Sequence, residues 1–593
     1  MKEFFKYVLA TITGIILLGA FFFVMSIISI VGMIASDSGT TSVEDGSVFV
    51  LDLSGSLDER ASEETPFDQL MGMSAGAMGL DDCLSAIKKA KENDKIKGIF
   101  IQAGSLMADS PASQETLRRA LADFKKSGKW IVAYGDTYLQ GAYYIASVAD
   151  RIYLNPTGSV DWRGMGARPY YLKGLYEKVG IKYQLAKVGK YKSAVEMNTA
   201  DGMSEADREQ RTVLLQSIWN QKVKEVAESR KTTVEALNQL ADDSLVAMSD
   251  PADLVKAKLI DQLAWPEEVK ADVKKRLGLG DDDDIPQLTL SQMIGVKSKE
   301  KDKGDEVAVY YAYGTIYDTD LSTLTGSHCI AGDQMAKDLL ELADEDDVKA
   351  VVIRVNSPGG SANASEQINH AIKKLKEKKP VVVSMGGYAA SGGYYISSPA
   401  DYIFAESTTV TGSIGIYGMI PNYNGLAQKL GLKFDEVATN KYATWESNLV
   451  AGTDNADIMR QIENHVVRGY DLFLTRVAEG RKMNKEQVNE IAQGRVWAAT
   501  DALKIKLIDK IGDLDAAVAK AAQLAKLNEY HKTAYPSPKP WYEQILEDQT
   551  SSGSILDSKF ASLFGPLYQP LLEMKAMTPK NWIQASIDFK IDN

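Results

Sequence analysis

Short runs of apolar, mostly β-branched residues alternate along most of the chain with stretches in which apolar residues recur every three or four positions. The first pattern is typical of buried parallel strands, and the second of the helices that cover them. The chain therefore predicts an α/β fold in which crossover helices join parallel strands. The predicted strands include Val48–Leu53, Gly98–Ile101, Trp130–Tyr134, Val307–Ala312, Ala350–Ile353 and Val381–Ser384, and the predicted helices include Ser113–Lys126 and Glu366–Lys378.

This pattern occurs twice, at a spacing of about 250 residues. Asp94–Ile101 resembles Asp346–Ile353, and Lys258–Asp261 resembles Lys506–Asp509. A solenoid repeat is only roughly 20 to 50 residues long, so the spacing indicates duplication of a whole domain. We refer to the two copies as repeat one and repeat two.

The chain begins with a long uncharged segment, Tyr7–Ser36. About 20 apolar residues are enough to span a bilayer. A cleaved signal peptide is the alternative, but its apolar region is typically about 7 to 15 residues long. Lys2 and Lys6 precede the segment and acidic residues follow it. We therefore expect one membrane anchor, with the N-terminus in the cytoplasm and the rest of the chain on the other side.

The remaining patterns set the expected domain boundaries. The charged stretch Asp281–Glu306 contains the joint between the repeats. After Asn528, prolines interrupt the pattern, and the apolar stretch Ile555–Met577 predicts a packed appendage or, alternatively, a membrane or partner contact. The expected parts are the cytoplasmic tip and anchor (1–45), repeat one (46–296), a charged linker (297–306), repeat two (307–528) and a C-terminal appendage (529–593).

Composition narrows the classes of function. In 593 residues, 80 acidic side chains outnumber 67 basic ones, and the net charge of −13 argues against a nucleic-acid-binding protein. Two cysteines, Cys83 and Cys329, cannot form a disulfide framework, and the four histidines show none of the spacings of a zinc site. We expect neither a metal nor a cofactor.

The repeats differ at the positions where chemistry is expected. Repeat two carries Ser391 before two glycines and two tyrosines, and 251 positions earlier repeat one has Gln140. Repeat one carries Lys192 in a Gly-Lys-Tyr-Lys-Ser sequence, and 251 positions later repeat two has Ala443. Each repeat lacks the group that the other supplies. The pattern predicts a single site built from Ser391 and Lys192.

A serine hydroxyl needs a base to take its proton before it attacks a carbonyl carbon. No histidine lies in a recognisable motif, so Lys192 is the candidate base. The amine must be neutral, and each unit by which its pKa falls from about 10.4 costs ~1.4 kcal/mol. Burial lowers the pKa of a lysine, whereas a nearby carboxylate raises it. We therefore expect Lys192 to be buried without a carboxylate partner.

Paired glycines indicate where the oxyanion of the reaction could bind. Gly359 and Gly360 follow a predicted buried strand, and glycine lets the backbone approach a ligand closely. Gly392 follows Ser391 in a loop that is expected to open a helix, where backbone N–H groups are free. A tight turn is the alternative for each pair, but repeat one lacks the first pair. Gly360 and Gly392 are our candidate oxyanion donors.

Ser413 is the candidate for a third group at the site. It lies in Thr411–Gly415, which matches Thr157–Asp161 of repeat one. We expect its hydroxyl to hold the amine of Lys192. The alternative is that this Thr-Gly-Ser sequence is ordinary turn chemistry.

Five sequence strings together resemble signal peptide peptidase A, in its long, membrane-anchored and duplicated form. They are Gly-Lys-Tyr-Lys-Ser-Ala-Val-Glu, Asn-Ser-Pro-Gly-Gly-Ser, Ala-Ala-Ser-Gly-Gly-Tyr-Tyr-Ile-Ser, Thr-Gly-Ser-Ile-Gly and Gly494-Arg-Val-Trp497. The resemblance extends to about residue 525 and implies two tandem domains of the Clp protease and crotonase fold. It implies a serine protease with Ser391 as nucleophile, Lys192 as general base, Ser413 orienting the lysine, and Gly360 and Gly392 binding the oxyanion.

The same resemblance implies the setting in which the protein acts. It implies a homotetramer, anchored in the bacterial inner membrane with its catalytic body on the periplasmic side. The substrates would be remnant signal peptides and other apolar peptides.

Two other classes of function remain open at this point. A crotonase-type enzyme acting on acyl thioesters would share the fold, but it would leave the division of Ser391 and Lys192 between the repeats unexplained. A non-catalytic membrane scaffold of the same fold would give these residues no reason to occur in complementary repeats.

Overall fold

The computed structural model describes residues 41–61, 77–299, 303–322, 328–452, 455–536 and 583–586, together with four isolated positions nearer the N-terminus. Apart from those four positions, the predicted anchor Tyr7–Ser36 lies outside the described residues, as does Ile555–Met577. Among the residues that are described, no helix combines the length and apolar character that crossing a bilayer requires.

Repeat one forms a parallel sheet of six strands in the order β10-β1-β4-β6-β7-β9. The sheet and the helices beside it share one apolar core. The strands are β1 Ser47–Leu53, β4 Ile96–Ala103, β6 Trp130–Tyr138, β7 Arg151–Val160, β9 Gln262–Leu263 and β10 Gln287–Leu288; the helices include α3 Leu80–Glu92, α4 Pro111–Lys125 and α5 Gln140–Ala146.

Repeat two forms the sheet β20-β18-β16-β14-β11-β22, in which only β18 and β20 run antiparallel. Of the ten residues of β14, only Lys349 is exposed, because elements cover both faces of the sheet. The strands are β11 Asp305–Tyr313, β14 Val348–Ser357, β16 Val381–Ala390, β17 Tyr402–Ala405, β18 Val410–Gly412, β20 Val496–Ala498, β21 Lys510–Ile511 and β22 Tyr530–Tyr535; the helices include α14 Gly332–Asp344, α15 Ala362–Lys376, α16 Gly392–Ser397 and α22 Leu514–Leu524.

The predicted duplication is confirmed by the matching helices of the two repeats. The long helices α8 (Glu205–Arg230) and α19 (Ala456–Arg481) each contain 26 residues and begin 251 positions apart. Each ends at a lysine in the left-handed conformation, Lys231 with φ 52° and Lys482 with φ 54°. The other helices are α6 Lys173–Val179, α7 Glu196–Thr199, α9 Val234–Asp243, α10 Pro251–Lys256, α11 Pro266–Leu277, α12 Leu290–Ile294, α17 Asn424–Lys429, α18 Trp445–Ala451, α20 Lys485–Ile491 and α21 Ala499–Lys504.

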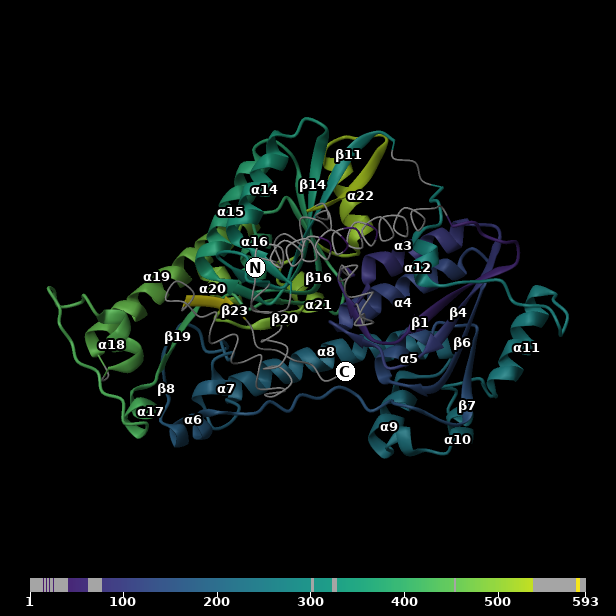
Figure 1. Cartoon of the computed structure of the whole chain (residues 1–593), viewed down its shortest axis with the longest axis horizontal. Helices are drawn as coiled ribbons and strands as arrows, with labels where there is room; N and C mark the ends of the chain where they lie inside the picture. The colour runs from purple at the N-terminus through teal and green to yellow at the C-terminus, as the bar shows by residue number, and fades with distance from the viewer. Residues whose placement is uncertain are drawn as a thin grey trace, which may run out of the picture.

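An arm of repeat one reaches across repeat two. Strand β8 (Lys182–Lys187) of repeat one pairs antiparallel with β19 (Tyr417–Asn422) of repeat two. Figure 1 shows α6, α7 and β8 beside β19 and α17, at the far side of the molecule from the repeat-one sheet. The arm therefore delivers residues of repeat one to the site of repeat two. The sheet that contains β8 and β19 also holds β12 Thr315–Tyr317, β13 Cys329–Ala331, β15 Gly359–Ser361 and β23 Ile583–Ser586.

Buried polar contacts fix how the repeats meet. Arg354 of β14 donates to Glu59 over 2.5 Å, and both side chains are less than 5% exposed. Glu115 of α4 accepts hydrogen bonds from the backbone and the hydroxyls of Ser407 and Thr408. A buried charge is tolerated only when it is paired and hydrogen-bonded, so these contacts specify one orientation of the repeats. A small sheet of β2 Ser56–Asp58, β3 Met78–Gly79 and β5 Met107–Ala108 adjoins this region.

Candidate active site

The structure brings together the three side chains that the sequence placed in the site. Lys192 and Ser391 come from different repeats, and the amine Nζ lies 2.7 Å from the Ser391 hydroxyl Oγ. The same amine lies 3.0 Å from the hydroxyl and 3.2 Å from the carbonyl oxygen of Ser413. All three residues are at most 1% exposed. The amine of one repeat and the hydroxyl of the other are therefore in direct hydrogen-bond contact.

The surroundings of Lys192 favour the neutral amine. Burial lowers the pKa of this lysine well below its ordinary value. Within the described part of the chain, no carboxylate forms an ion pair with it. Its polar partners are the hydroxyl of Ser391 and the hydroxyl and carbonyl of Ser413. A neutral amine in this position can accept the proton of the Ser391 hydroxyl.

Ser391 lies in a sharp turn between a strand and a helix. It follows β16 and precedes α16, and its backbone has φ 55° and ψ −116°. These angles match the first central residue of a type II′ turn, a position that favours glycine. The Ser391 N–H donates to the Gly412 carbonyl over 2.8 Å, which ties the turn to β18. The strained conformation is therefore held in place by the sheet.

The two candidate oxyanion donors lie in two elements, β15 and α16, that contact each other beside this turn. Gly392 is the first residue of α16, as the sequence predicted. Gly360 lies in β15, where a Cβ would be only 2.0 Å from the carbonyl oxygen of Ile316. The start of α16 also lies close to the end of β14, since a Cβ on Gly393 would be 2.6 Å from the carbonyl oxygen of Ser357. At Gly360 and Gly393, only glycine fits without movement of the backbone.

An extended segment of the chain already runs beside Gly360. Strand β23 lies between β15 and β19 and is antiparallel to both, with Ala585 opposite Gly360 and Gln584 opposite Tyr417. The sequence analysis did not predict this strand. Its location shows that an extended backbone fits between β15 and β19.

In repeat one, Gln140 occupies the position that corresponds to Ser391. This side chain is 2% exposed, and its amide nitrogen donates to the Gly164 carbonyl over 3.0 Å. Its amide oxygen accepts from the N–H groups of Arg163 and Gly164. Gln140 thus takes part in a local hydrogen-bond network and offers no nucleophile.

The segment Gln493–Trp497 holds Lys192 in place, a role that the sequence analysis did not predict. The Gln493 carbonyl accepts from the Tyr191 N–H over 2.9 Å, and the Arg495 carbonyl accepts from the Ser413 N–H over 2.7 Å. Gly494, with φ 81°, packs so closely on Lys192 that a Cβ would lie 2.6 Å from the lysine backbone nitrogen and Cβ. One short segment therefore contacts both sides of the site.

Replacing Gly494 with alanine is expected to lower kcat by about 10²-fold, because the new methyl group displaces Lys192 from Ser391 and a 1 Å misplacement costs roughly that much. Gly278→Ala is the matched control: Gly278 has a similar φ of 72°, but nothing lies within 4 Å of its Cβ. Peptide hydrolysis by both variants measures the difference. Equal activity of the two variants would show that the contact with Lys192 has no role in catalysis.

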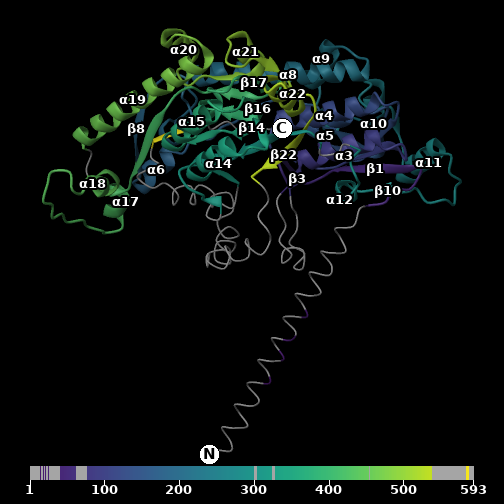
Figure 2. The ribbon, with the colours of Figure 1, turned by 90° about the horizontal axis from the view of Figure 1, so that it is seen from above.

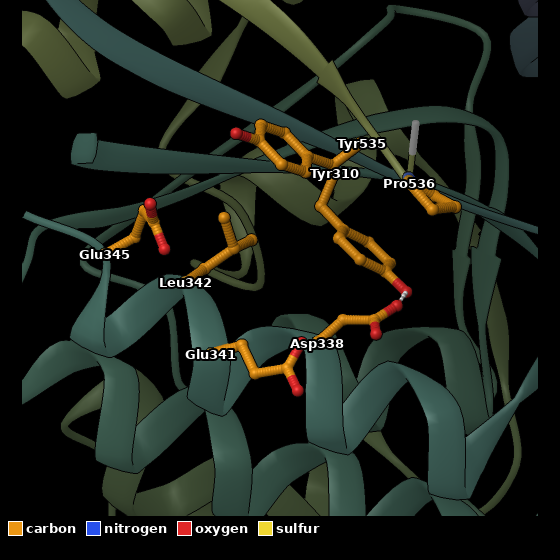
Figure 3. Close-up of a pocket in the computed structure, with 7 residues that line it drawn as sticks. All are labelled: Tyr310, Asp338, Glu341, Leu342, Glu345, Tyr535 and Pro536. Atoms are coloured by element: carbon orange, nitrogen blue, oxygen red, sulfur yellow. Dashed lines mark hydrogen bonds between the residues drawn. The ribbon is translucent and has the colours of Figure 1, made fainter. Parts of the chain in front are cut away.

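A surface cavity of about 230 Å³ lies elsewhere, between α14 and the end of β22. Figure 3 shows the Tyr310 hydroxyl directed at Asp338, to which it donates over 2.7 Å. None of the predicted site residues lines this cavity, so we do not associate it with the reaction. The lining residues are Tyr310, Asp338, Glu341, Leu342, Glu345, Tyr535 and Pro536.

Known proteins resemble this chain over most of its length. The model of peptidase family S49 matches residues 123–280 and again residues 373–528, and the Clp protease model matches residues 309–407. The chain is 35% identical to Protease 4 of Salmonella typhi, covering 85% of this chain and 82% of that protein. It is 33% identical to Protease 4 of Haemophilus influenzae, covering 86% and 84%. Identity to the chloroplastic serine protease SPPA of Arabidopsis thaliana is 30%, covering 82% and 70%.

The fold and the site define a serine protease built from two α/β repeats. The chain belongs to peptidase family S49, whose domain it contains twice. The resemblance to the duplicated signal peptide peptidase A is thereby confirmed. The family assignment therefore decides for a serine protease against the two other classes of function, the acyl-thioester enzyme and the scaffold.

Proposed function

We propose that the protein hydrolyses remnant signal peptides and other apolar peptides with a Ser391/Lys192 dyad. The observation that carries the proposal is the 2.7 Å contact between the buried amine of one repeat and the hydroxyl of the other. Burial lowers the pKa of Lys192, which agrees with its proposed role as the base because only a neutral amine can accept a proton.

In the proposed reaction, Ser391 Oγ attacks the peptide carbonyl carbon while Lys192 takes the hydroxyl proton. The Ser413 hydroxyl holds the amine in line with Ser391. The backbone N–H groups of Gly360 and Gly392 donate to the developing oxyanion. Lys192 then gives its proton to the leaving amine, and the acyl-enzyme is hydrolysed by a water that the neutral lysine activates.

We further propose that the substrate binds as an extended strand where β23 lies. Backbone pairing with β15 and β19 would give affinity for peptides of varied sequence, as in other cases of strand addition. This position would carry the peptide past Gly360. It agrees with a protease that accepts many apolar peptides.

If β23 competes with substrate, a chain that ends at residue 582 is expected to have a several-fold lower KM for peptides. An intramolecular segment competes at an effective concentration of about millimolar, and its removal frees the groove. A chain that ends at residue 589 keeps β23 and is the matched control. An unchanged KM in the shorter chain would place the substrate elsewhere.

The location and assembly are also proposals. The uncharged segment Tyr7–Ser36, preceded by Lys2 and Lys6, supports an anchor in the bacterial inner membrane with a cytoplasmic N-terminus and a periplasmic catalytic body. The match to the Clp protease model supports an oligomer, and we propose a homotetramer.

The full-length chain in lipid vesicles, mixed with a synthetic signal peptide, tests the proposed function. We expect the wild type to cut the peptide and Ser391→Ala to leave it intact while retaining the wild-type assembly. A wild-type enzyme that cuts soluble casein but never the membrane-bound peptide would contradict the proposed substrate. Unchanged cutting by Ser391→Ala would contradict the proposed nucleophile.

A further inference from the structure

A buried side chain of α8 contacts the chain on both sides of Lys192. Gln210 is 2% exposed. Its amide nitrogen donates to the carbonyl oxygen of Tyr191 over 3.0 Å and to the hydroxyl oxygen of Ser193 over 2.8 Å. Tyr191 and Ser193 are the residues before and after Lys192 in the chain. One amide group therefore holds the segment that carries the candidate base.

The oxygen of the same amide contacts repeat two. The Val496 N–H in β20 donates to the amide oxygen of Gln210 over 3.2 Å. Val496 is paired with Gly412 of β18, and the carbonyl of Gly412 accepts from the N–H of Ser391. Gln210 therefore connects the two neighbours of Lys192 to the strands that hold the turn of Ser391.

The hydrogen-bond partners allow only one orientation of this amide. Carbonyl and carboxylate oxygens accept hydrogen bonds but cannot donate them. The amide nitrogen therefore faces the carbonyl of Tyr191 and the carboxylate of Asp207, which is 3.0 Å away. The amide oxygen faces the N–H of Val496. A side chain without both a donor and an acceptor cannot replace these contacts.

Asp207 completes the network, and its charge is paired with an arginine. Asp207 is 1% exposed, and one of its oxygens accepts from the Ser193 hydroxyl over 2.6 Å. The other oxygen accepts from the guanidinium of Arg211 over 2.7 Å. A buried carboxylate requires such partners. Because Arg211 pairs with this carboxylate, the network can hold the segment of Lys192 while the amine stays neutral.

Repeat two lacks this network as well as the lysine. The residues 251 positions after Asp207, Gln210 and Arg211 are Ile458, Gln461 and Ile462. Ile458 packs in an apolar cluster, and Gln461 is exposed. Both repeats nevertheless form the same helix of 26 residues. The buried polar network is therefore not needed to build this helix, and it occurs in the repeat that has kept Lys192.

Apolar contacts also hold α8 against repeat two. Leu214 and Ile218 follow Gln210 at intervals of four residues and so lie on the same helix face. Both are buried in an apolar cluster with residues of β18 and β20. Figures 1 and 2 show α8 between the sheet of repeat two and α9 of repeat one. Loss of the Gln210 amide should therefore loosen the segment of Lys192 without releasing α8.

We propose that Gln210 is a positioning residue, whose amide holds the Lys192 amine against Ser391 by joining both neighbours of the lysine to β20. The inference rests on the proposed function, in which Lys192 is the base. Among the described residues, the hydrogen-bond partners of Gln210 lie on α8, beside Lys192 and in β20. The substrate is proposed to bind elsewhere, between β15 and β19. The loss of Gln210 should therefore change kcat and not KM.

The test is Gln210→Met in the full-length chain, with steady-state hydrolysis of a synthetic signal peptide. Methionine has a similar length but makes none of these hydrogen bonds. We expect kcat to fall about 10- to 100-fold with KM unchanged, because a 1 Å misplacement of a catalytic group can cost roughly 10²-fold. Labelling of Ser391 by a fluorophosphonate should slow by the same factor, because it requires an activated hydroxyl but no bound peptide. Gln461→Met, at the equivalent exposed position of α19, is the matched control and should keep the wild-type kcat.

An unchanged kcat for Gln210→Met, or a raised KM with normal labelling of Ser391, would overturn the inference. Lys192→Met, measured in parallel, separates this result from the proposed function. An inactive Lys192→Met beside a fully active Gln210→Met would overturn the positioning role alone, whereas an active Lys192→Met would contradict both proposals. If circular dichroism shows that Gln210→Met does not fold, Ser193→Ala removes a single hydroxyl of the network. That variant should have a several-fold lower kcat with unchanged KM, and a wild-type kcat would overturn the inference.

Discussion

Lys192→Met is expected to lower the rate of peptide hydrolysis by about 10²- to 10⁴-fold, the usual contribution of a general base. Methionine has a similar length and fills the same buried space, but it cannot accept the proton of Ser391. Steady-state hydrolysis of a signal peptide measures the loss. Near-normal activity of this variant would show that another group takes the proton.

The same variant is expected to be more stable than the wild type at neutral pH. Burial lowers the pKa of Lys192 in the folded chain, so unfolding takes up a proton at every pH between that lowered value and the ordinary value near 10.5. The buried lysine therefore destabilises the folded chain, and this cost falls as the pH rises through that window and disappears near the ordinary pKa of lysine. Lys192→Met removes the cost.

Unfolding temperatures measured between pH 6 and pH 10 test the sign of this effect. The advantage of Lys192→Met over the wild type should shrink as the pH rises toward the ordinary pKa of lysine. An advantage that stays constant over this range would mean that the folded chain holds Lys192 as a charged ammonium. Ser413→Ala is the comparison, because it removes one hydroxyl contact of the amine without removing the titrating group.

Ser391→Ala and Ser391→Gly are both expected to lose peptide hydrolysis, by up to roughly 10⁶-fold if the serine is the nucleophile. Their stabilities should differ. Residue 391 has φ 55° and ψ −116°, which glycine adopts readily and alanine does not. We expect Ser391→Gly to be more stable than Ser391→Ala by about 1 kcal/mol, the lower end of the cost of such backbone strain.

Chemical denaturation of the two variants measures that difference, since both lack the hydroxyl and leave Lys192 with the same remaining partners. Equal stability, or a more stable alanine variant, would mean that the turn is not strained. Substantial hydrolysis by either variant would exclude Ser391 as the nucleophile.

Much of the fold followed from the sequence because buried parallel strands have a strong apolar signal. The predicted strand Val381–Ser384 forms the first part of β16, and the predicted helix Glu366–Lys378 overlaps α15. Repeat one lacks the serine and repeat two lacks the lysine, and from this pattern we predicted that Ser391 and Lys192 lie together. The two side chains lie 2.7 Å apart. Their catalytic roles remain predictions.

The contacts between segments that are far apart in the chain did not follow from the sequence. The sequence of β8, Lys182–Lys187, has the pattern of an ordinary half-buried strand. Nothing in that pattern indicates that its partner is β19 of the other repeat. The role of Gly494 depends on a three-dimensional contact with Lys192, although the Gly-Arg-Val-Trp string had marked the segment. Strand β23 is only four residues long, too short for a periodic signal.

The central claim is that the amine of one repeat activates the hydroxyl of the other, and the rate of labelling by a fluorophosphonate as a function of pH tests it most directly. Mass spectrometry should locate the adduct on Ser391, with a rate that falls as the pH drops below the pKa of Lys192, and Lys192→Met should not react. Labelling that is independent of pH and unchanged in Lys192→Met, or an adduct on a different serine, would contradict the account.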